Sequence, residues 1–127
     1  NVLRGGLTVK HVDVEELLRI GKFRPQPPAV ISGADRETRG DGCPGTDYPA
    51  PFGEFSFARV DMDGPCAIPG GRALILFCAD GNVTLKAAGS DGVRILPGES
   101  VFVPAFVRRV TALGRASLFQ ATVGDEG

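Results

Sequence analysis

The first ten residues hold the two cations whose spacing is best suited to chemistry. Arg4 and Lys10 lie on either side of the pair Gly5-Gly6. A guanidinium can bind an anion through two hydrogen bonds or stabilise an oxyanion, and a lysine can hold an anion or assist proton transfer. Because glycine has no Cβ, the pair would let the backbone approach a bound molecule closely. The stretch predicts a site for an anionic small molecule, although such cations, taken alone, are more often solvated surface.

His11, the one histidine of the sequence, directly follows Lys10. A tight transition-metal site needs several ligands that converge at about 2.0–2.3 Å, which one histidine cannot supply. We therefore expect no metal site in this chain and a structural or surface role for His11. The cysteines at positions 43, 66 and 78 form no Cys-x-x-Cys pair, so the sequence suggests neither a disulfide framework nor a zinc ribbon. Cys78 lies in an apolar run and is expected in the core.

The charges are nearly balanced, with 14 basic and 15 acidic residues and a formal net charge of -1. No block of like charge stands out, which argues against a nucleic-acid or anionic-membrane partner. No run approaches the ~20 apolar residues that span a bilayer, and no signal peptide is seen, so we expect no membrane contact. Without predicted disulfides, a reducing, cytoplasmic location fits best. Asn1 in place of an initiator Met predicts a processed piece or a domain cut from a longer protein.

One short helix is expected near the N-terminus. Asp13 and Glu16 form a capping-box-like pair, apolar residues follow at helical spacing, and Gly21 is a suitable stop, which predicts about two turns. The proline-rich region 22–54 is interpreted as a linker, with one short strand at 30–31 and an exposed or disordered stretch at 36–42.

The remainder predicts short β-strands separated by Gly and Pro, at 55–62, 73–79, 83–86, 93–96, 100–103, 109–112 and 117–123. The alternation of 55–62 slips, which a bulge or burial on both faces would explain. The apolar run 73–79 is expected to be buried on both sides, and Asp80-Gly81 to form a hairpin turn. The regular spacing of the predicted strands favours an antiparallel sandwich or small barrel.

Residues 92–104, with an expected tight turn at Pro97-Gly98, resemble the second sequence motif of the cupin superfamily. In that family a Pro-Gly turn links two strands of a jelly-roll barrel, and metal-binding members carry histidines where this chain has none. The resemblance implies an all-β fold, a cupin-like jelly roll or antiparallel β-sandwich barrel with one short helix near the N-terminus. It also implies that the barrel has lost its metal site or never had one.

Residues 1–18, Asn-Val-Leu-Arg-Gly-Gly-Leu-Thr-x-Lys-His-Val-Asp-Val-x-Glu-Leu-Leu, carry a more distinctive resemblance. They are similar to the segment that follows the active-site histidine in type I mannose-6-phosphate isomerases, also called phosphomannose isomerases. The similarity continues through residues 54–60, 81–85 and 97–104. Val9 stands where the family usually has Pro; this changes the local backbone but leaves both cations in place.

This resemblance implies a parent zinc enzyme that interconverts mannose 6-phosphate and fructose 6-phosphate through an enediol(ate). Arg4 matches the family's active-site arginine and is expected to be catalytic, whereas Lys10 matches the active-site lysine and is expected to bind substrate. The family's zinc ligands lie upstream of this segment, so the chain would lack the N-terminal catalytic domain, bind no zinc and be inactive alone. Residues 1–26 would end the catalytic barrel and include the helix and linker; residues 27–127 would form the C-terminal cupin-like barrel.

Two alternatives stay open. The chain could be a stand-alone, metal-free cupin that binds a sugar or organic acid without turnover. It could also be a structural barrel that shields a catalytic domain and mediates subunit contacts. A Gln-x-His with a later Glu and His, encoded before Asn1, would favour the isomerase.

Overall fold

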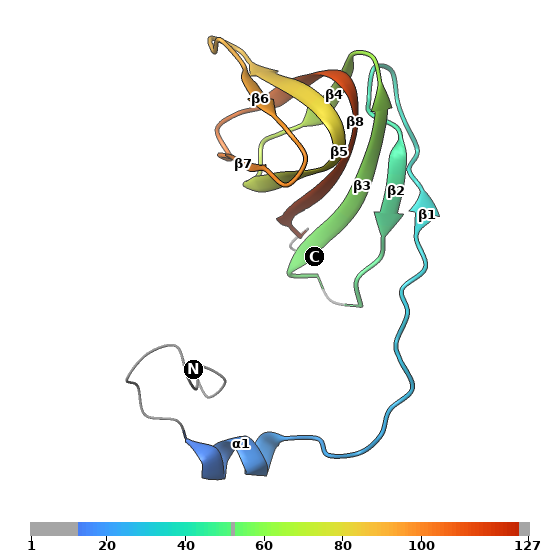
Figure 1. Cartoon of the computed structure of the whole chain (residues 1–127), viewed down its shortest axis with the longest axis vertical. Helices are drawn as coiled ribbons and strands as arrows, with labels where there is room; N and C mark the ends of the chain where they lie inside the picture. Colours follow the sequence, from blue (N-terminus) through green and yellow to red (C-terminus); the bar gives the residue numbers. More distant parts are fainter. Residues whose placement is uncertain (1–12, 52, 125–127) are drawn as a thin grey trace.

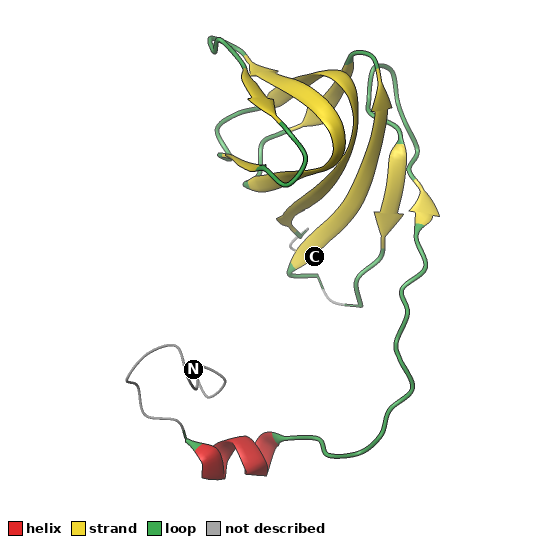
Figure 2. Cartoon of the chain, viewed as in Figure 1, coloured by secondary structure: helices red, strands yellow, loops and turns green. Residues whose placement is uncertain are grey.

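The computed structural model describes residues 13–51 and 53–124 of the chain (Figure 1). The described part contains helix α1 (Val14–Ile20) and strands β1 (Ala34–Asp35), β2 (Gly45–Tyr48), β3 (Phe55–Asp63), β4 (Cys66–Pro69), β5 (Leu74–Ala87), β6 (Val93–Ile95), β7 (Ser100–Val103) and β8 (Arg109–Val123). The strands curve around one core, which confirms the all-β prediction with one short helix (Figure 2).

Helix α1 begins and ends where the sequence predicts. The Asp13 carboxylate accepts a hydrogen bond from the backbone N–H of Glu16 at 2.9 Å, and the N–H of Gly21 caps the last turn. The Glu16 carboxylate pairs with Arg19 rather than returning to the start of the helix, and this pairing lowers the pKa of Glu16. No residue of α1 is buried, and in Figure 1 the helix lies apart from the strands.

The long strands β5 and β8 form the centre of the barrel. They pair in antiparallel fashion from Leu74 opposite Thr122 to Ala87 opposite Val110. The other edge of β8 pairs with β3 and β4, and the other edge of β5 pairs with β6 and β7. Strands β2 and β1 extend the sheet beyond β3. The named strand pairs are all antiparallel, so neighbouring side chains alternate between the core and the outer face.

The core is built from the inward positions of these strands. Its largest fully buried side chains are Val60, Ile68, Leu76, Cys78, Val83 and Leu118. Cys78 has no exposed surface, as predicted. The turn at Pro97-Gly98 is also confirmed: Gly98 has φ +88° and its N–H bonds the carbonyl of Cys78 at 2.9 Å. This turn joins β6 to β7, which both pair with β5.

Two predictions about β5 were wrong. Ile75 and Phe77 are 50% and 39% exposed, so the strand is buried on one side only. Its outer face is apolar, and an apolar outer face looks like double burial in the sequence. Asp80 and Gly81 form no hairpin either; the strand continues past them with a register shift between Cys78 and Asp80, and Gly81 accommodates the bend with φ +78°.

Three further strand predictions need correction. The pairing of β3 with β8 is unbroken from Phe55 to Asp63, so the slipped alternation marks neither a bulge nor double burial but two phenylalanines on the outer face. Strand β4 was not predicted. Strand β8 is one continuous strand where the sequence suggested two, because Gly114 adopts φ +132° within it and looked like a turn.

The linker interpretation of residues 22–54 holds only for its first part. Residues 30–31 form no strand, but β1 and β2 lie inside this region and belong to the sheet. The hydrogen-bonding demand of the exposed β3 edge explains why such short, weakly patterned strands form there. The expected boundary between residues 26 and 27 stays a prediction.

In the part of the chain that the structure describes, no helix is long and apolar enough to cross a membrane.

Candidate functional site

The cations predicted to do chemistry lie outside the described residues. Arg4, Lys10 and His11 all fall within residues 1–12, which the structure does not describe. Their roles therefore stay predictions, and the site described below is built from other residues.

Metal ligands do not gather in the described part of the chain. Residues 13–51 and 53–124 contain no group of three or more His, Cys, Asp or Glu side chains that could hold a metal ion. Cys43 and Cys66 are bonded to each other, and Cys78 is buried by itself. The described residues do not fit a zinc site, so no zinc chemistry is assigned to them.

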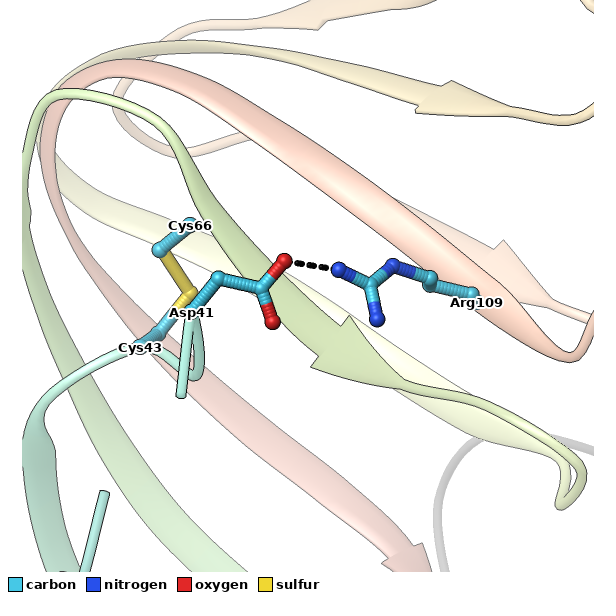
Figure 3. The surroundings of a disulfide bond; sticks show 4 residues. All are labelled: Asp41, Cys43, Cys66 and Arg109. Atoms are coloured by element: carbon cyan, nitrogen blue, oxygen red, sulfur yellow. Dashed lines mark hydrogen bonds and ion pairs between the residues drawn. A yellow bond between two sulfur atoms is a disulfide. The ribbon is translucent and has the colours of Figure 1, made fainter. Parts of the chain in front are cut away.

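Cys43 and Cys66 form a disulfide, contrary to the sequence-based prediction (Figure 3). Their Cα atoms are 5.0 Å apart although 23 positions separate them in the sequence. They meet because Gly42 bridges to Ala67, a residue of the unpredicted strand β4. Disulfides are typical of oxidising compartments, so the sequence argument for a reducing compartment no longer holds.

A salt bridge lies beside this disulfide. The Arg109 guanidinium donates a hydrogen bond to the Asp41 carboxylate, as Figure 3 shows. The two side chains are 57% and 66% exposed, so solvent screens the pair and its contribution to stability is small. Together with the disulfide, this pair fastens the segment before β2 to β4 and β8.

A cavity of about 490 Å³ lies along strands β1, β2, β3 and β8. The lining residues that bear on its chemistry are Arg36, Asp47 and Gln120. A neighbouring cavity of about 340 Å³ shares Arg36 and Gln120 with it and reaches Cys43. The disulfide therefore helps to hold one wall of this pair of cavities.

Gln120 lies at the base of both cavities. Gln120 lies two residues after Leu118 on β8, so its side chain faces the interior on the same side of the strand. Its neighbours on the adjacent strands are Ala58 and Leu76, which are both buried. It is the buried polar residue of the described chain, at 8% exposure, and its Oε1 has no hydrogen-bond partner. Leaving a buried carbonyl unsatisfied costs about 1–3 kcal/mol, so this position favours a ligand or water that donates a hydrogen bond.

Arg36 and Asp47 form an ion pair at the rim. Arg36 Nε donates to Asp47 Oδ1 at 2.9 Å, and Nη2 lies 2.8 Å from the same oxygen. The arginine side chain is only 19% exposed, whereas that of Asp47 is 53% exposed. Arg36 directly follows β1 and Asp47 lies on the neighbouring strand β2, so the pair forms one wall whose net charge is close to zero.

Aromatic rings cover the opposite, outer face of the same strands. The Tyr48 and Phe57 centroids are 5.7 Å apart, and Phe57 stacks on Phe119 at 5.5 Å with an interplanar angle of 9°. The cavity itself combines a buried amide and a neutralised ion pair with small apolar side chains such as Ala34, Ala50 and Ala58. Small-molecule sites commonly have this composition of apolar lining with a few placed polar groups.

The sequence reasoning missed Arg36, Asp47 and Gln120. Arg36 and Asp47 lay in a region interpreted as linker. Only Gln120 gave a usable signal, because the buried positions that precede it on β8 are all apolar: Val110, Ala112, Ala116 and Leu118.

Comparison with known proteins places the barrel in a described family. Residues 45–123 match the family model for the cupin domain of mannose-6-phosphate isomerase. The mannose-6-phosphate isomerase of Escherichia coli (strain K12) is 36% identical over 125 residues, covering 93% of this chain and 29% of that protein. The enzyme of that name from Salmonella typhimurium is 35% identical over 121 residues, with the same coverage.

Solved structures agree with this match. A point mutant of phosphomannose isomerase from Salmonella typhimurium has a TM-score of 0.68 and 29% identity, covering 94% of this chain and 30% of that one. A zinc-bound mannose 6-phosphate isomerase has a TM-score of 0.66 and 30% identity, covering 94% and 29%. The chain spans about 29% of the length of the curated relatives it matches.

Proposed function

Because the chain belongs to the family of mannose-6-phosphate isomerase cupin domains, we propose that it is the C-terminal β-barrel of a zinc-dependent mannose-6-phosphate isomerase. The observation that carries this proposal is the extent of the family match. It runs from the first residue of β2 to the last residue of β8. The relatives are more than three times as long as the matched part, which leaves room for a separate catalytic domain.

The proposed parent enzyme interconverts mannose 6-phosphate and fructose 6-phosphate by moving a proton between C1 and C2 through an enediol(ate). In it, Arg4 would stabilise the developing oxyanion and Lys10 would bind the phosphate. Zinc would be held by residues outside this chain, since the described residues form no suitable ligand set. For this reason we propose that the chain alone is inactive.

The proposed division of the chain follows from the same reasoning. Residues 1–26 would complete the catalytic barrel and include α1 and its linker, and residues 27–127 would form the C-terminal barrel. The exposure of Val14, Leu18 and Ile20 on α1, each above 50%, supports a helix that packs against a part of the parent outside this chain.

A cytoplasmic location is compatible with the disulfide if cellular thiols cannot reach its sulfur atoms. Cys43 and Cys66 are 3% and 8% exposed, so cellular thiols have little access to the sulfur atoms. Thiol–disulfide exchange requires such access, and a buried bond can therefore resist reduction. We propose the cytoplasm on this basis; alkylation of free thiols in freshly lysed cells should leave Cys43 and Cys66 unlabelled.

Substitution in the full-length enzyme tests the assignment. Arg4→Ala should lower kcat/KM by about 30- to 150-fold, equivalent to a loss of ~2–3 kcal/mol of transition-state stabilisation. The matched control is Arg94→Ala, which removes an exposed arginine of β6 and should keep normal turnover. Normal turnover of Arg4→Ala, or zinc-dependent isomerisation by the 127-residue chain alone, would refute the proposal.

A further inference from the structure

We propose that the cavity along β1, β2, β3 and β8 binds a small, uncharged, polyhydroxylated molecule of about hexose size. The hydrogen-bonding groups of this site are the Gln120 amide and the Arg36–Asp47 pair. The site shares no residue with the stretch that contains Arg4 and Lys10, and it requires neither zinc nor turnover.

The first argument is the unsatisfied amide. Gln120 is more than nine-tenths buried, lines both cavities, and carries an Oε1 without a partner. An amide offers an acceptor and two donors, so its best partner both donates and accepts. A neutral hydroxyl group does both, whereas a carboxylate or a fully deprotonated phosphate group only accepts.

The second argument is the balance of charge. Arg36 already holds Asp47 at 2.8 Å, so an incoming anion would have to displace or share this carboxylate. An incoming cation would likewise have to displace or share the Arg36 guanidinium in order to reach Asp47. Both contacts of the pair use Oδ1, which leaves Oδ2 able to accept, and the remaining guanidinium N–H groups can donate. Such a pair discriminates in favour of neutral hydroxyl groups.

The third argument is the size and the apolar lining. A volume of about 490 Å³ lies within the range of small-molecule sites, ~300–1,000 Å³. Its apolar lining includes Ala34, Ala50 and Ala58, on which the C–H groups of a sugar ring or polyol can pack. The Cys43–Cys66 disulfide holds the segment before β2 against β4, so the wall that β2 contributes to the cavity is preorganised.

Titration of the zinc-free, 127-residue chain tests the proposal. Amide spectra would be recorded with added mannose, glucose, sorbitol or inorganic phosphate. We expect at least one of the three polyhydroxylated probes to give saturable shifts in β2, β8 and the Gln120 side-chain amide, and phosphate to give none. Gln120→Leu and Arg36→Met should each raise the dissociation constant of the tightest-binding probe by about tenfold or more.

Two controls keep the test interpretable. Gln120→Leu should fold at least as stably as the wild type, because an apolar side chain replaces an unsatisfied carbonyl. Arg94→Met removes an exposed arginine on β6 and should bind as the wild type does. The proposal is overturned if no polyhydroxylated probe gives saturable shifts, if phosphate alone binds, or if folded Gln120→Leu binds with unchanged affinity. None of these outcomes bears on isomerase activity, so the two proposals fail separately.

Discussion

Cys78 and Gln120 show two different fates of a buried polar side chain in one barrel. The Cys78 thiol lies within hydrogen-bonding reach of the carbonyl oxygens of Asp80 and Gly81, at 3.5 and 3.8 Å. Burial, and to a smaller extent the Asp80 carboxylate, raise the pKa of this thiol above its ordinary value of 9.0. Cys78 is thus satisfied and unreactive, whereas the Gln120 carbonyl lacks a partner.

The raised pKa predicts a loss of stability at alkaline pH. Below the unfolded-state pKa the thiol is protonated in both states and does not affect the pH dependence. Above it the unfolded chain releases a proton that the folded chain keeps, so the free energy of unfolding falls as pH rises toward the folded-state pKa. For one proton this slope is at most about 1.4 kcal/mol per pH unit.

Urea unfolding of wild type and Cys78→Ala between about pH 8 and pH 10.5 measures this effect against other alkaline titrations, which both proteins share. The stability advantage of the wild type should shrink as pH rises. An advantage that stays constant over this range would contradict the prediction.

At the residue level, prediction from sequence succeeded where one local pattern decides the outcome. Cys78 stands in an apolar run, and its burial follows from that run alone. Gln120, Arg36 and Asp47 come together only through strand pairing between segments far apart in the chain. Their shared site could not be predicted from the sequence, because it depends on the register of β1, β2, β3 and β8.

Among the structural elements, the segment between β1 and β2 depends most on one covalent bond. The Cys43–Cys66 disulfide closes a loop of 23 positions and joins this segment to β4. Cys43→Ala with Cys66→Ala should therefore lower the free energy of unfolding by about 3 kcal/mol, mainly through the greater freedom of the unfolded chain. Chemical unfolding in oxidising buffer measures this change.

A reductant provides the matched control for the disulfide. Dithiothreitol should destabilise the wild type once the bond is reduced, and it should leave the double variant unchanged. If the wild type and the double variant were equally stable in oxidising buffer, the disulfide would make no contribution and the prediction would be wrong.

Element predictions were accurate where the boundary signals were local. The cap at Asp13, the stop at Gly21 and the turn at Pro97-Gly98 placed α1 and β7 correctly. The long strands were broken wrongly, because Gly81 and Gly114 resemble turn residues but permit bends within β5 and β8. Added Cβ atoms there would lie 2.2 Å and 2.6 Å from backbone oxygens of the facing strand, a tertiary reason for glycine that sequence cannot show.

At the scale of the whole molecule, the described residues before β1 contribute nothing to the core of the barrel. None of the described residues 13–33 is buried, while the core lies entirely within residues 43–118. A chain shortened to residues 32–127 should therefore keep cooperative unfolding, with a free energy within about 0.5 kcal/mol of the 127-residue chain. Urea unfolding of both chains is the measurement.

A second truncation gives the contrast. A chain of residues 49–127 also lacks β1, β2 and Cys43. It should unfold at a clearly lower urea concentration, because the β3 edge and Cys66 lose their partners. A strong loss of stability in the 32–127 chain would instead show that the removed segment contributes to the barrel.

The position of β8 in the sequence has a consequence for biosynthesis. β8 is the last strand of the described chain, yet it pairs with β3, β4 and β5. While the ribosome is still translating, the emerging strands lack this central partner, and their exposed edges are open to chaperones or to other nascent chains. The barrel can close only after residue 123 has emerged. A premature stop codon a few residues before Arg109 would therefore abolish the fold rather than shorten it.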